Sequence, residues 1–244
     1  MEVNVEGFVH SVETGGAVDG PGLRFVVFLS GCALRCLYCH NPDTWHMPDG
    51  KKTGVAQLLN EIASYRDFML RTGGGVTATG GEPLAQPDFV TALFQGCKTL
   101  GLHTALDTSG FLGANATDAL LAATDLVLLD IKSFDPATYK HLTGGNLAPT
   151  LAFAERLAKI GKPTWLRYVL VPGLTDDIAS IERLAAYAKG LGMAKVEVLP
   201  FHKMGEVKYK ALHIPYTLDQ TQPPSPELIA QVKAIFVGHG LKTV

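Results

Sequence analysis

Short apolar runs and longer amphipathic stretches alternate along the chain from position 23 onward. The short runs are rich in β-branched and other apolar residues and end in polar or glycine-rich sequence, a pattern that is typical of buried β-strands. We therefore predict six strands, at Leu23–Leu29, Gly75–Thr79, His103–Asp107, Leu126–Ile131, Thr164–Val171 and Lys195–Leu199.

Amphipathic helices are predicted between these strands. In the clearest of them, one apolar stripe with helical spacing is formed by Ile178, Ile181, Leu184, Ala185, Ala188 and Leu191, after which Gly192 ends the helix. A similar stripe runs from Leu58 to Tyr65, and the proline-rich segment 223–226 leads into a last helix over Glu227–Val237. This alternation, together with a near-continuous apolar strand at Leu126–Leu129, predicts a parallel sheet covered by helices.

The predicted fold class is therefore α/β. Six β/α units are too few for a complete eight-stranded barrel, so we expect an open or partial barrel, with a Rossmann-like doubly wound sheet as the alternative. The chain shows no internal repeat and no interdomain linker. We expect a single domain over residues 1–244, in which residues 1–22 form an N-terminal extension before the first barrel strand.

Polar or glycine-rich sequence follows each predicted strand. In both architectures ligands bind at the carboxyl ends of the strands, so these segments should share one edge of the sheet. They are the cysteine loop after Leu29, Thr79–Glu82, Asp107–Ser109, Asp130–Lys132, Val171–Gly173 and Pro200–His202.

Composition and charge narrow the class of protein. With 47% hydrophobic and 18% charged residues, the chain reads as an ordinary globular domain. Lys and Arg number 21 against 23 for Asp and Glu, so no basic field favours nucleic acid. The first ten residues lack the basic start and apolar run of a secretion signal, and no window approaches the roughly 18 consecutive apolar residues of a membrane span. We expect a cytoplasmic protein without nucleic-acid or membrane partners.

Three of the four cysteines, Cys32, Cys36 and Cys39, lie within eight residues. This spacing is too close for a disulfide framework and is typical of metal binding or catalysis. Three thiolates can bind three corners of a cubane iron-sulfur cluster. Because such clusters usually have four cysteine ligands, the fourth iron is either open to a substrate or bound by a distant residue.

Cys97 is the one cysteine left for that distant position. It lies in the apolar helical pattern of residues 89–100, where we expect a small buried hydrophobe. A zinc site is the alternative for the triplet. Zinc usually takes four ligands from paired Cys-x-x-Cys units, and His40, directly beside Cys39, is poorly placed to complete a tetrahedron.

The cysteine motif and its flanks resemble a known group, the radical S-adenosylmethionine superfamily, and within it the activating enzymes of glycyl-radical enzymes. The resemblance covers almost the whole chain. It rests on Gly20–Arg24, Phe28, Gly31, the motif Cys32–Cys39 with His40 and Asn41, Asp43–Trp45, Gly73–Thr77, Gly80–Glu82, Asp107–Thr108, Leu129–Asp130, Arg167–Val169 and Leu199–His202. It implies a partial (β/α)6 barrel, in agreement with the six predicted strands.

The resemblance also implies one 4Fe-4S cluster on Cys32, Cys36 and Cys39 and roles around bound S-adenosylmethionine. By it, Gly80, Gly81 and Glu82 bind the amino group of that molecule, where a carboxylate suits an ammonium. Asp107, Thr108 and Asp130 help hold its carboxylate, with a monovalent cation between the acids. The other residues that it places at the cofactor are Tyr38, Cys39, His40, Lys132 and His202.

The implied activity is reductive cleavage of S-adenosylmethionine to methionine and a 5'-deoxyadenosyl radical, which abstracts hydrogen from a glycine of pyruvate formate-lyase. Asp19 and Arg167 match positions that meet the glycine loop, although either residue could instead be a turn cap or an ion-pair member. The resemblance further implies a separate flavodoxin- or ferredoxin-like electron donor, and we expect a monomer. The alternatives are the activase of another glycyl-radical enzyme and a non-catalytic iron-sulfur protein.

Overall fold

The computed structural model describes residues 5–244, so residues 1–4 of the predicted N-terminal extension lie outside the described residues. Internal contacts divide the chain into two compact units. The first unit comprises the described residues up to Ala33, Asp43–Thr108 and Leu112–Leu128, and the second comprises Leu34–Pro42, Ser109–Phe111 and Leu129–Val244. The single-domain assignment stays a prediction.

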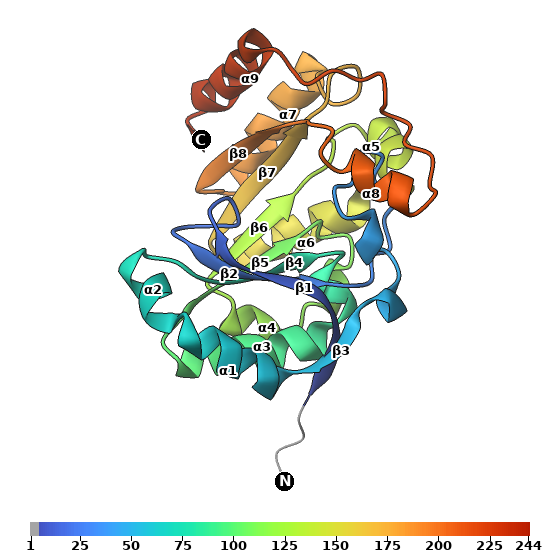
Figure 1. Cartoon of the computed structure of the whole chain (residues 1–244). Helices are drawn as coiled ribbons and strands as arrows, with labels where there is room; N and C mark the ends of the chain where they lie inside the picture. The colour runs from blue at the N-terminus through green and yellow to red at the C-terminus, as the bar shows by residue number, and fades with distance from the viewer. Residues whose placement is uncertain (1–4) are drawn as a thin grey trace. The chain divides into compact units, whose positions relative to one another are not determined.

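The first unit is built on a mixed sheet with the strand order β3-β1-β2-β4-β5-β6. Its strands are β1 (Glu6–Gly16), β2 (Arg24–Leu29), β3 (Lys51–Gly54), β4 (Gly75–Gly80), β5 (His103–Thr108) and the first three residues of β6 (Leu126–Asp130). Strands β2, β4 and β5 are parallel, whereas β1 runs antiparallel to β2 and β3. Its helices are α1 (Val55–Ser64), α2 (Arg66–Arg71), α3 (Pro87–Thr99) and α4 (Asp118–Ala123), with 3-10 turns η1 (Pro42–Thr44), η2 (Met47–Asp49), η3 (Pro83–Ala85) and η4 (Gly113–Asn115). Helices α1, α3 and α4 pack side by side against one face of this sheet (Figure 1).

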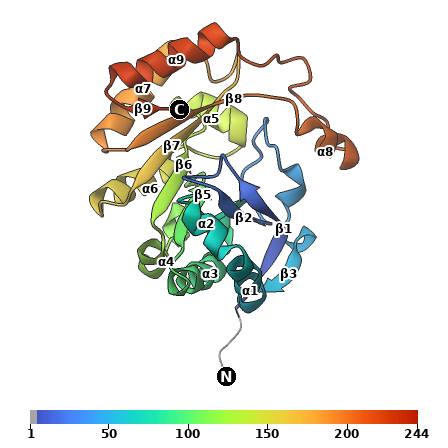
Figure 2. The same ribbon diagram turned by 60° about the vertical axis from the view of Figure 1, so that its left-hand side comes forward.

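The second unit contains the last two residues of β6 and the strands β7 (Thr164–Leu170), β8 (Lys195–Pro200) and β9 (Lys242–Thr243), in the order β6-β7-β8-β9. Strands β7, β8 and β9 are parallel. The helices of this unit are α5 (Pro136–Thr143), α6 (Ala148–Lys159), α7 (Ile178–Gly190), α8 (Glu206–Ala211) and α9 (Pro226–Gly238). Figure 2 shows α7 and α9 lying together beside β8.

The six predicted strands are confirmed as β2, β4, β5, β6, β7 and β8, to within one residue at each end. The predicted helices are confirmed as α1, α3, α7 and α9. Strands β1, β3 and β9 were not predicted. In β1 the burial alternates only partly along the strand, and Gly7, Gly15 and Gly16 weaken its β-propensity, so the sequence lacks the usual strand signal.

Helix starts near the polar edge are fixed by side-chain caps. Asp135 accepts the Thr138 backbone N–H at the start of α5, and Asp177 accepts the Ser180 backbone N–H at the start of α7. Each cap satisfies a backbone donor that the first helical turn leaves free. Gly144, with φ of 75°, ends α5 in the left-handed region that glycine enters without strain.

One ion pair in the first unit joins α3 to the segment before β6. Lys98 Nζ lies 2.7 and 2.8 Å from the two carboxylate oxygens of Asp125, which also accepts the Thr104 backbone N–H at 2.9 Å. Burial alone would raise the pKa of Asp125. The hydrogen bonds from Lys98 and Thr104 lower the pKa by more than burial raises it, so the pKa lies below the ordinary value of 3.8.

This depressed pKa predicts a pH-dependent contribution to stability. We expect Asp125→Asn to lower the free energy of unfolding by about 1 kcal/mol at neutral pH. Because the folded-state pKa is the lower one, the contribution is complete above the unfolded-state pKa and is lost as the pH falls through the folded-state value. Urea denaturation should therefore show a constant difference above roughly pH 5 that shrinks below roughly pH 4. A difference that stays unchanged at the lowest pH would contradict the assignment.

Of the helices in residues 5–244, none combines the length and the apolar character needed to cross a membrane.

Candidate functional site

Backbone hydrogen bonds fix the approach to the first cysteine. The Gly31 N–H donates to Thr44 O at 2.7 Å, and the Cys32 N–H donates to Trp45 O at 3.0 Å. The Cys32 thiol is partly exposed. The end of β2 therefore delivers Cys32 to the polar edge of the first unit in a defined backbone conformation.

The turn after β4 lies directly against this approach. The Glu82 N–H donates to Gly31 O at 2.8 Å. A Cβ atom on Gly81 would lie 2.5 Å from Gly31 O, and one on Gly80, whose φ is +108°, would lie 2.4 Å from the Leu29 nitrogen. Both contacts are closer than real side chains allow, so two glycines are required where the two backbones meet.

The ends of β4 and β5 bring three predicted site residues together. Glu82 is only 2% exposed, and its Oε1 accepts the Thr108 hydroxyl at 2.6 Å and the Leu84 N–H at 3.1 Å. Beside them, the Thr79 hydroxyl donates to Asp107 Oδ2 at 2.7 Å. Hydrogen bonds thus hold two carboxylates in place on neighbouring strand ends, where they can receive a cationic group.

Cys36 and Cys39 lie in an irregular loop of the second unit, and both thiols are partly exposed. The Cys39 N–H donates to Cys36 O at 3.0 Å. The Asn41 N–H donates to Cys39 Sγ at 3.4 Å, and Asn41 Oδ1 accepts Lys208 Nζ at 2.9 Å. An amide donor at the sulfur favours the thiolate, which is the form that binds iron.

A lysine-aspartate pair follows β6 in the same unit. Lys132 Nζ forms an ion pair with Asp130 Oδ2 and lies 5.6 Å from the centre of the Tyr38 ring. Burial lowers the pKa of Lys132, but the charge of Asp130, with those of Tyr38 and Cys36, raises it well above the usual value. Burial also raises the pKa of Tyr38. Within residues 5–244, the buried atoms Asp130 Oδ1 and Tyr38 Oη have no hydrogen-bond partner, so both remain able to bind a ligand.

Two predicted histidines form a stacked pair. The rings of His40 and His202 lie 4.1 Å apart between centroids with an interplanar angle of 22°, and His40 Nε2 is 3.1 Å from His202 O. Burial lowers the pKa of His40 despite that backbone contact. His202 is therefore positioned beside the cysteine loop of its unit, as the sequence predicted for a residue at the end of β8.

The two residues predicted to meet a partner peptide differ in their surroundings. Asp19, in the loop between β1 and β2, has its backbone carbonyl held by the Thr77 hydroxyl at 2.7 Å. Arg167 is 8% exposed, and its Nε lies 3.3 Å from a carboxylate oxygen of Glu197, its neighbour across β7 and β8. Arg167 is thus an ion-pair member, which was its alternative interpretation. Contact with a peptide stays a prediction for both residues.

Cys97 is fully buried on α3, and burial raises the pKa of its thiol to about 12. A thiol with such a pKa stays protonated at neutral pH, whereas an iron ligand must be a thiolate. The interpretation of Cys97 as a small buried hydrophobe is confirmed.

Sequence reasoning missed the role of Arg24. Its guanidinium is completely buried in the first unit, where Nε donates to the Thr77 hydroxyl at 2.9 Å and Nη2 donates to Val76 O at 2.6 Å. Burial lowers the pKa of Arg24 to about 10, so it remains charged at neutral pH. Through Thr77 it supports the Asp19 loop. A lone cation at the start of an apolar strand was the available signal.

Gln86 is a second residue whose supporting role was not predicted from the sequence. Its side-chain amide donates to Phe8 O and to Ser30 O, each at 2.9 Å, and its carbonyl oxygen accepts the Phe8 N–H at 2.7 Å. Gln86 therefore joins β1 to the segment that enters the cysteine loop. No sequence pattern distinguishes it from an ordinary glutamine.

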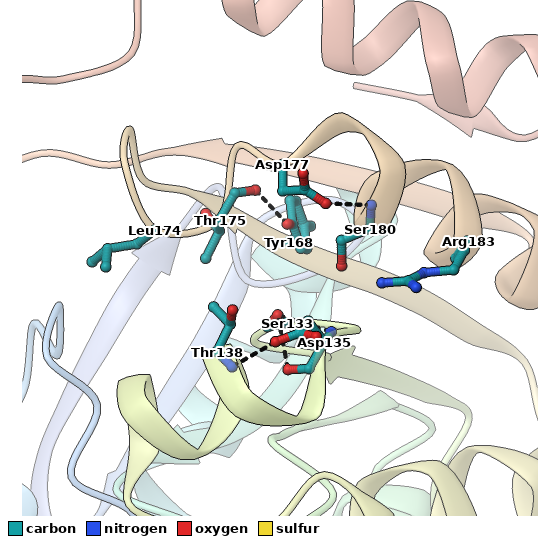
Figure 3. A pocket seen from close by; sticks show the side chains of 9 residues that line it. All are labelled: Ser133, Asp135, Thr138, Tyr168, Leu174, Thr175, Asp177, Ser180 and Arg183. Atoms are coloured by element: carbon teal, nitrogen blue, oxygen red, sulfur yellow. Dashed lines mark hydrogen bonds between the residues drawn. The ribbon is translucent and has the colours of Figure 1, made fainter.

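A separate cavity of about 220 Å³ lies in the second unit, between the starts of α5 and α7. Figure 3 shows Ser133 and Asp135 on one side of it and Ser180 and Arg183 on the other. Of the described residues that line it, none is a predicted site residue. It is therefore a cavity beside the polar edge and outside the predicted site.

Comparisons with known proteins identify the class that this arrangement defines. The profile of the Radical SAM superfamily matches residues 26–185, which include the cysteine loop and the ends of the first five predicted strands. The chain is thus an enzyme of the radical S-adenosylmethionine class. The predicted α/β fold of that class is confirmed.

Full-length relatives define the family within this class. The chain is 44% identical over 245 residues to the pyruvate formate-lyase 1-activating enzyme of Escherichia coli strain K12, covering 99% of this chain and all of that protein. It is 45% identical over 240 residues to the pyruvate formate-lyase-activating enzyme of Streptococcus mutans, covering 95% and 91% of the two chains. It also resembles the crystal structure of a domain of such an enzyme from Bacteroides vulgatus, with a TM-score of 0.59 and 28% identity over 70% of this chain and 98% of that one. The chain belongs to the family of pyruvate formate-lyase activating enzymes.

Proposed function

We propose that this chain activates pyruvate formate-lyase by generating a radical on one of its glycines. The observation that carries the proposal is the set of three partly exposed thiols, Cys32, Cys36 and Cys39, in a chain that aligns from end to end with named activating enzymes. The fourth cysteine is buried and protonated, which supports a cluster with three cysteine ligands and one open iron.

The chemistry of the donor set suits a 4Fe-4S cluster. All three residues offer thiols on irregular loop backbone, and Cys39 already accepts an amide N–H. When bound, the cluster would supply the one electron that cleaves the sulfonium carbon-sulfur bond of S-adenosylmethionine, giving methionine and a 5'-deoxyadenosyl radical that takes the hydrogen atom of a glycine Cα. The chain itself contributes binding, orientation and the exclusion of water.

Residues of the first unit are assigned to the amino group of S-adenosylmethionine. The backbone carbonyls of Gly80 and Gly81 are the proposed acceptors for its N–H groups. The Glu82 carboxylate is held by Thr108 and suits an ammonium. Burial of Glu82 strengthens such a charge pair, provided that the ammonium arrives to compensate the carboxylate.

Residues of the second unit are assigned to other parts of S-adenosylmethionine. Lys132 carries the positive charge that suits a carboxylate, and Tyr38 offers an aromatic ring near it. His40 and His202 complete this set as a stacked pair beside the cysteine loop. The unpartnered buried atoms Asp130 Oδ1 and Tyr38 Oη support ligand binding here.

We also keep the monovalent cation as a proposal at Asp107, Thr108 and Asp130. Among residues 5–244, no three His, Cys, Asp or Glu side chains are grouped so that they could hold a metal ion. Moreover, Asp130 is already neutralised by Lys132. A cation therefore needs the carboxylate of bound S-adenosylmethionine to complete its site.

The glycine loop of pyruvate formate-lyase is the proposed substrate, with Asp19 and Arg167 as candidate contacts. A separate flavodoxin- or ferredoxin-like protein is the proposed electron donor. The monomeric state and the cytoplasmic location also stay predictions.

Anaerobic reconstitution tests the function directly. The protein is loaded with iron and sulfide, and dithionite, S-adenosylmethionine and pyruvate formate-lyase are added. We expect 5'-deoxyadenosine by chromatography and a glycyl radical by electron paramagnetic resonance. Deoxyadenosine without the glycyl signal would overturn the assigned partner, and neither product from a fully loaded cluster would overturn the enzymatic proposal.

Activation of another glycyl-radical enzyme is the second candidate. The named relatives are 42–45% identical over nearly the whole chain, which favours pyruvate formate-lyase. The same assay with an anaerobic ribonucleotide reductase as the acceptor separates the two candidates.

A further inference from the structure

An exposed apolar stripe lies on α8 and the turn before it, within the second unit. Met204 is 78% exposed and Val207 is 68% exposed, which places both among the most exposed large hydrophobic residues of the described chain. Ala211 is also exposed. The spacing of three and four residues places all three on one side of a helical turn. Exposure of such an apolar stripe to water is unfavourable in free energy, and another surface that covers the stripe removes this cost.

The opposite side of α8 packs on the cysteine loop. A Cβ atom on Gly205 would lie 3.0 Å from His40 Cα and 3.1 Å from Cys39 O, so only glycine allows this contact. Lys208 donates to Asn41, whose N–H donates to Cys39 Sγ. Tyr209 on this side of the helix is 3% exposed. The apolar stripe is therefore separated from the Cys39 backbone by the thickness of one helix, about 10 Å.

Positive charge surrounds the stripe. Lys203, Lys208 and Lys210 lie within eight residues that contain one acid, Glu206, and that acid is paired with Lys210 at 2.7 Å. The whole chain has a formal charge of −2, so this cluster differs in sign from the rest of the protein. A small apolar patch ringed by lysines suits a transient partner with an acidic surface.

We propose that Met204, Val207 and Ala211, with the surrounding lysines, form the docking surface for the electron donor, an acidic flavin or iron-sulfur protein. This inference rests on the proposed function and names the place where its electron enters. The transfer rate falls steeply with distance, so the donor must dock near a cluster ligand. The apolar stripe on α8 meets that requirement, because the other side of this helix packs on the loop that carries Cys39. With the cluster bound at the cysteines, such a donor would supply it with one electron and would itself be oxidised by one electron.

The test compares two reductants on the same holoenzyme. In the double variant Met204→Glu/Val207→Glu, both new carboxylates are exposed, so the fold should be kept, and they repel an acidic partner. The matched control is Val237→Glu on α9, a residue that is 56% exposed. 5'-Deoxyadenosine formation is measured with dithionite and then with increasing amounts of reduced flavodoxin at two salt concentrations.

We expect the dithionite-driven rate of the double variant to stay within about twofold of the parent protein, whereas kcat/KM for flavodoxin falls about tenfold or more. Lys203→Ala should weaken the salt dependence of the flavodoxin reaction alone, and Val237→Glu should change neither reaction. Equal flavodoxin kinetics in the parent protein and the double variant would overturn the inference. So would a loss of glycyl radical on pyruvate formate-lyase under dithionite with deoxyadenosine intact, because the surface would then bind the target enzyme. An inactive parent protein under dithionite would instead refute the proposed function.

Discussion

Replacing Cys39 by serine is expected to abolish reductive cleavage of S-adenosylmethionine, lowering 5'-deoxyadenosine formation to below about a thousandth of the parent rate. This loss corresponds to about 4 kcal/mol or more of barrier. The physical reason is that serine supplies no thiolate at the position where Asn41 and the Cys36 carbonyl already orient the ligand. The iron content and the visible absorption of the reconstituted protein should fall in parallel with activity.

Cys97→Ala is the control for this variant. Its thiol is buried on α3 with a pKa raised to about 12, so the change should remove only a small packing contribution, about 1 kcal/mol. Iron content and activity should remain those of the parent protein. A Cys97→Ala protein that cannot hold the cluster would show that the fourth iron has a protein ligand, contrary to the open-iron proposal.

Lys132→Met is expected to weaken both folding and binding of S-adenosylmethionine. The side chains of Lys132 and Asp130 are each 14% exposed, so the variant leaves a largely buried carboxylate without its partner. We expect the free energy of unfolding to fall by about 2 to 3 kcal/mol in urea. Isothermal titration of the reconstituted protein should show affinity for S-adenosylmethionine reduced at least about tenfold, since the cation beside Tyr38 is removed.

The double variant Asp130→Asn/Lys132→Met separates the two effects. Removing both charges eliminates the unpaired carboxylate, so most of the lost stability should return. Binding should not return, because the lysine is still missing. Recovery of binding together with stability would mean that Lys132 acts only by neutralising Asp130.

The strands were predictable because their physics is local. Runs such as Leu126–Leu129 are apolar throughout, since a parallel strand covered by helices is buried on both faces. In contrast, β1 carries glycines and lies half exposed, and its place is fixed by pairing with β2 and β3, which no local pattern records.

Site residues could be predicted where the sheet topology alone determines their position, at the carboxyl ends of parallel strands. Glu82 lies just after β4, and Asp107 and Thr108 are the last residues of β5, so the rule for parallel sheets was enough to bring them together. The supporting residues were not predictable, because their partners are distant in sequence. Gln86 contacts Phe8 across 78 positions, and Lys208 contacts Asn41 across 167. Their roles depend on backbone atoms that the sequence does not distinguish.

The contact between Gly81 and Gly31 couples the movement of two segments at this edge of the first unit. The two backbones meet without a side chain between them, and the Glu82 N–H bonds to Gly31 O. Neither residue therefore has a rotamer that could absorb a displacement. Any shift of the turn that carries Glu82 must be shared by the residue before Cys32, so an acidic group and a thiol separated by fifty positions in sequence behave mechanically as one rigid piece.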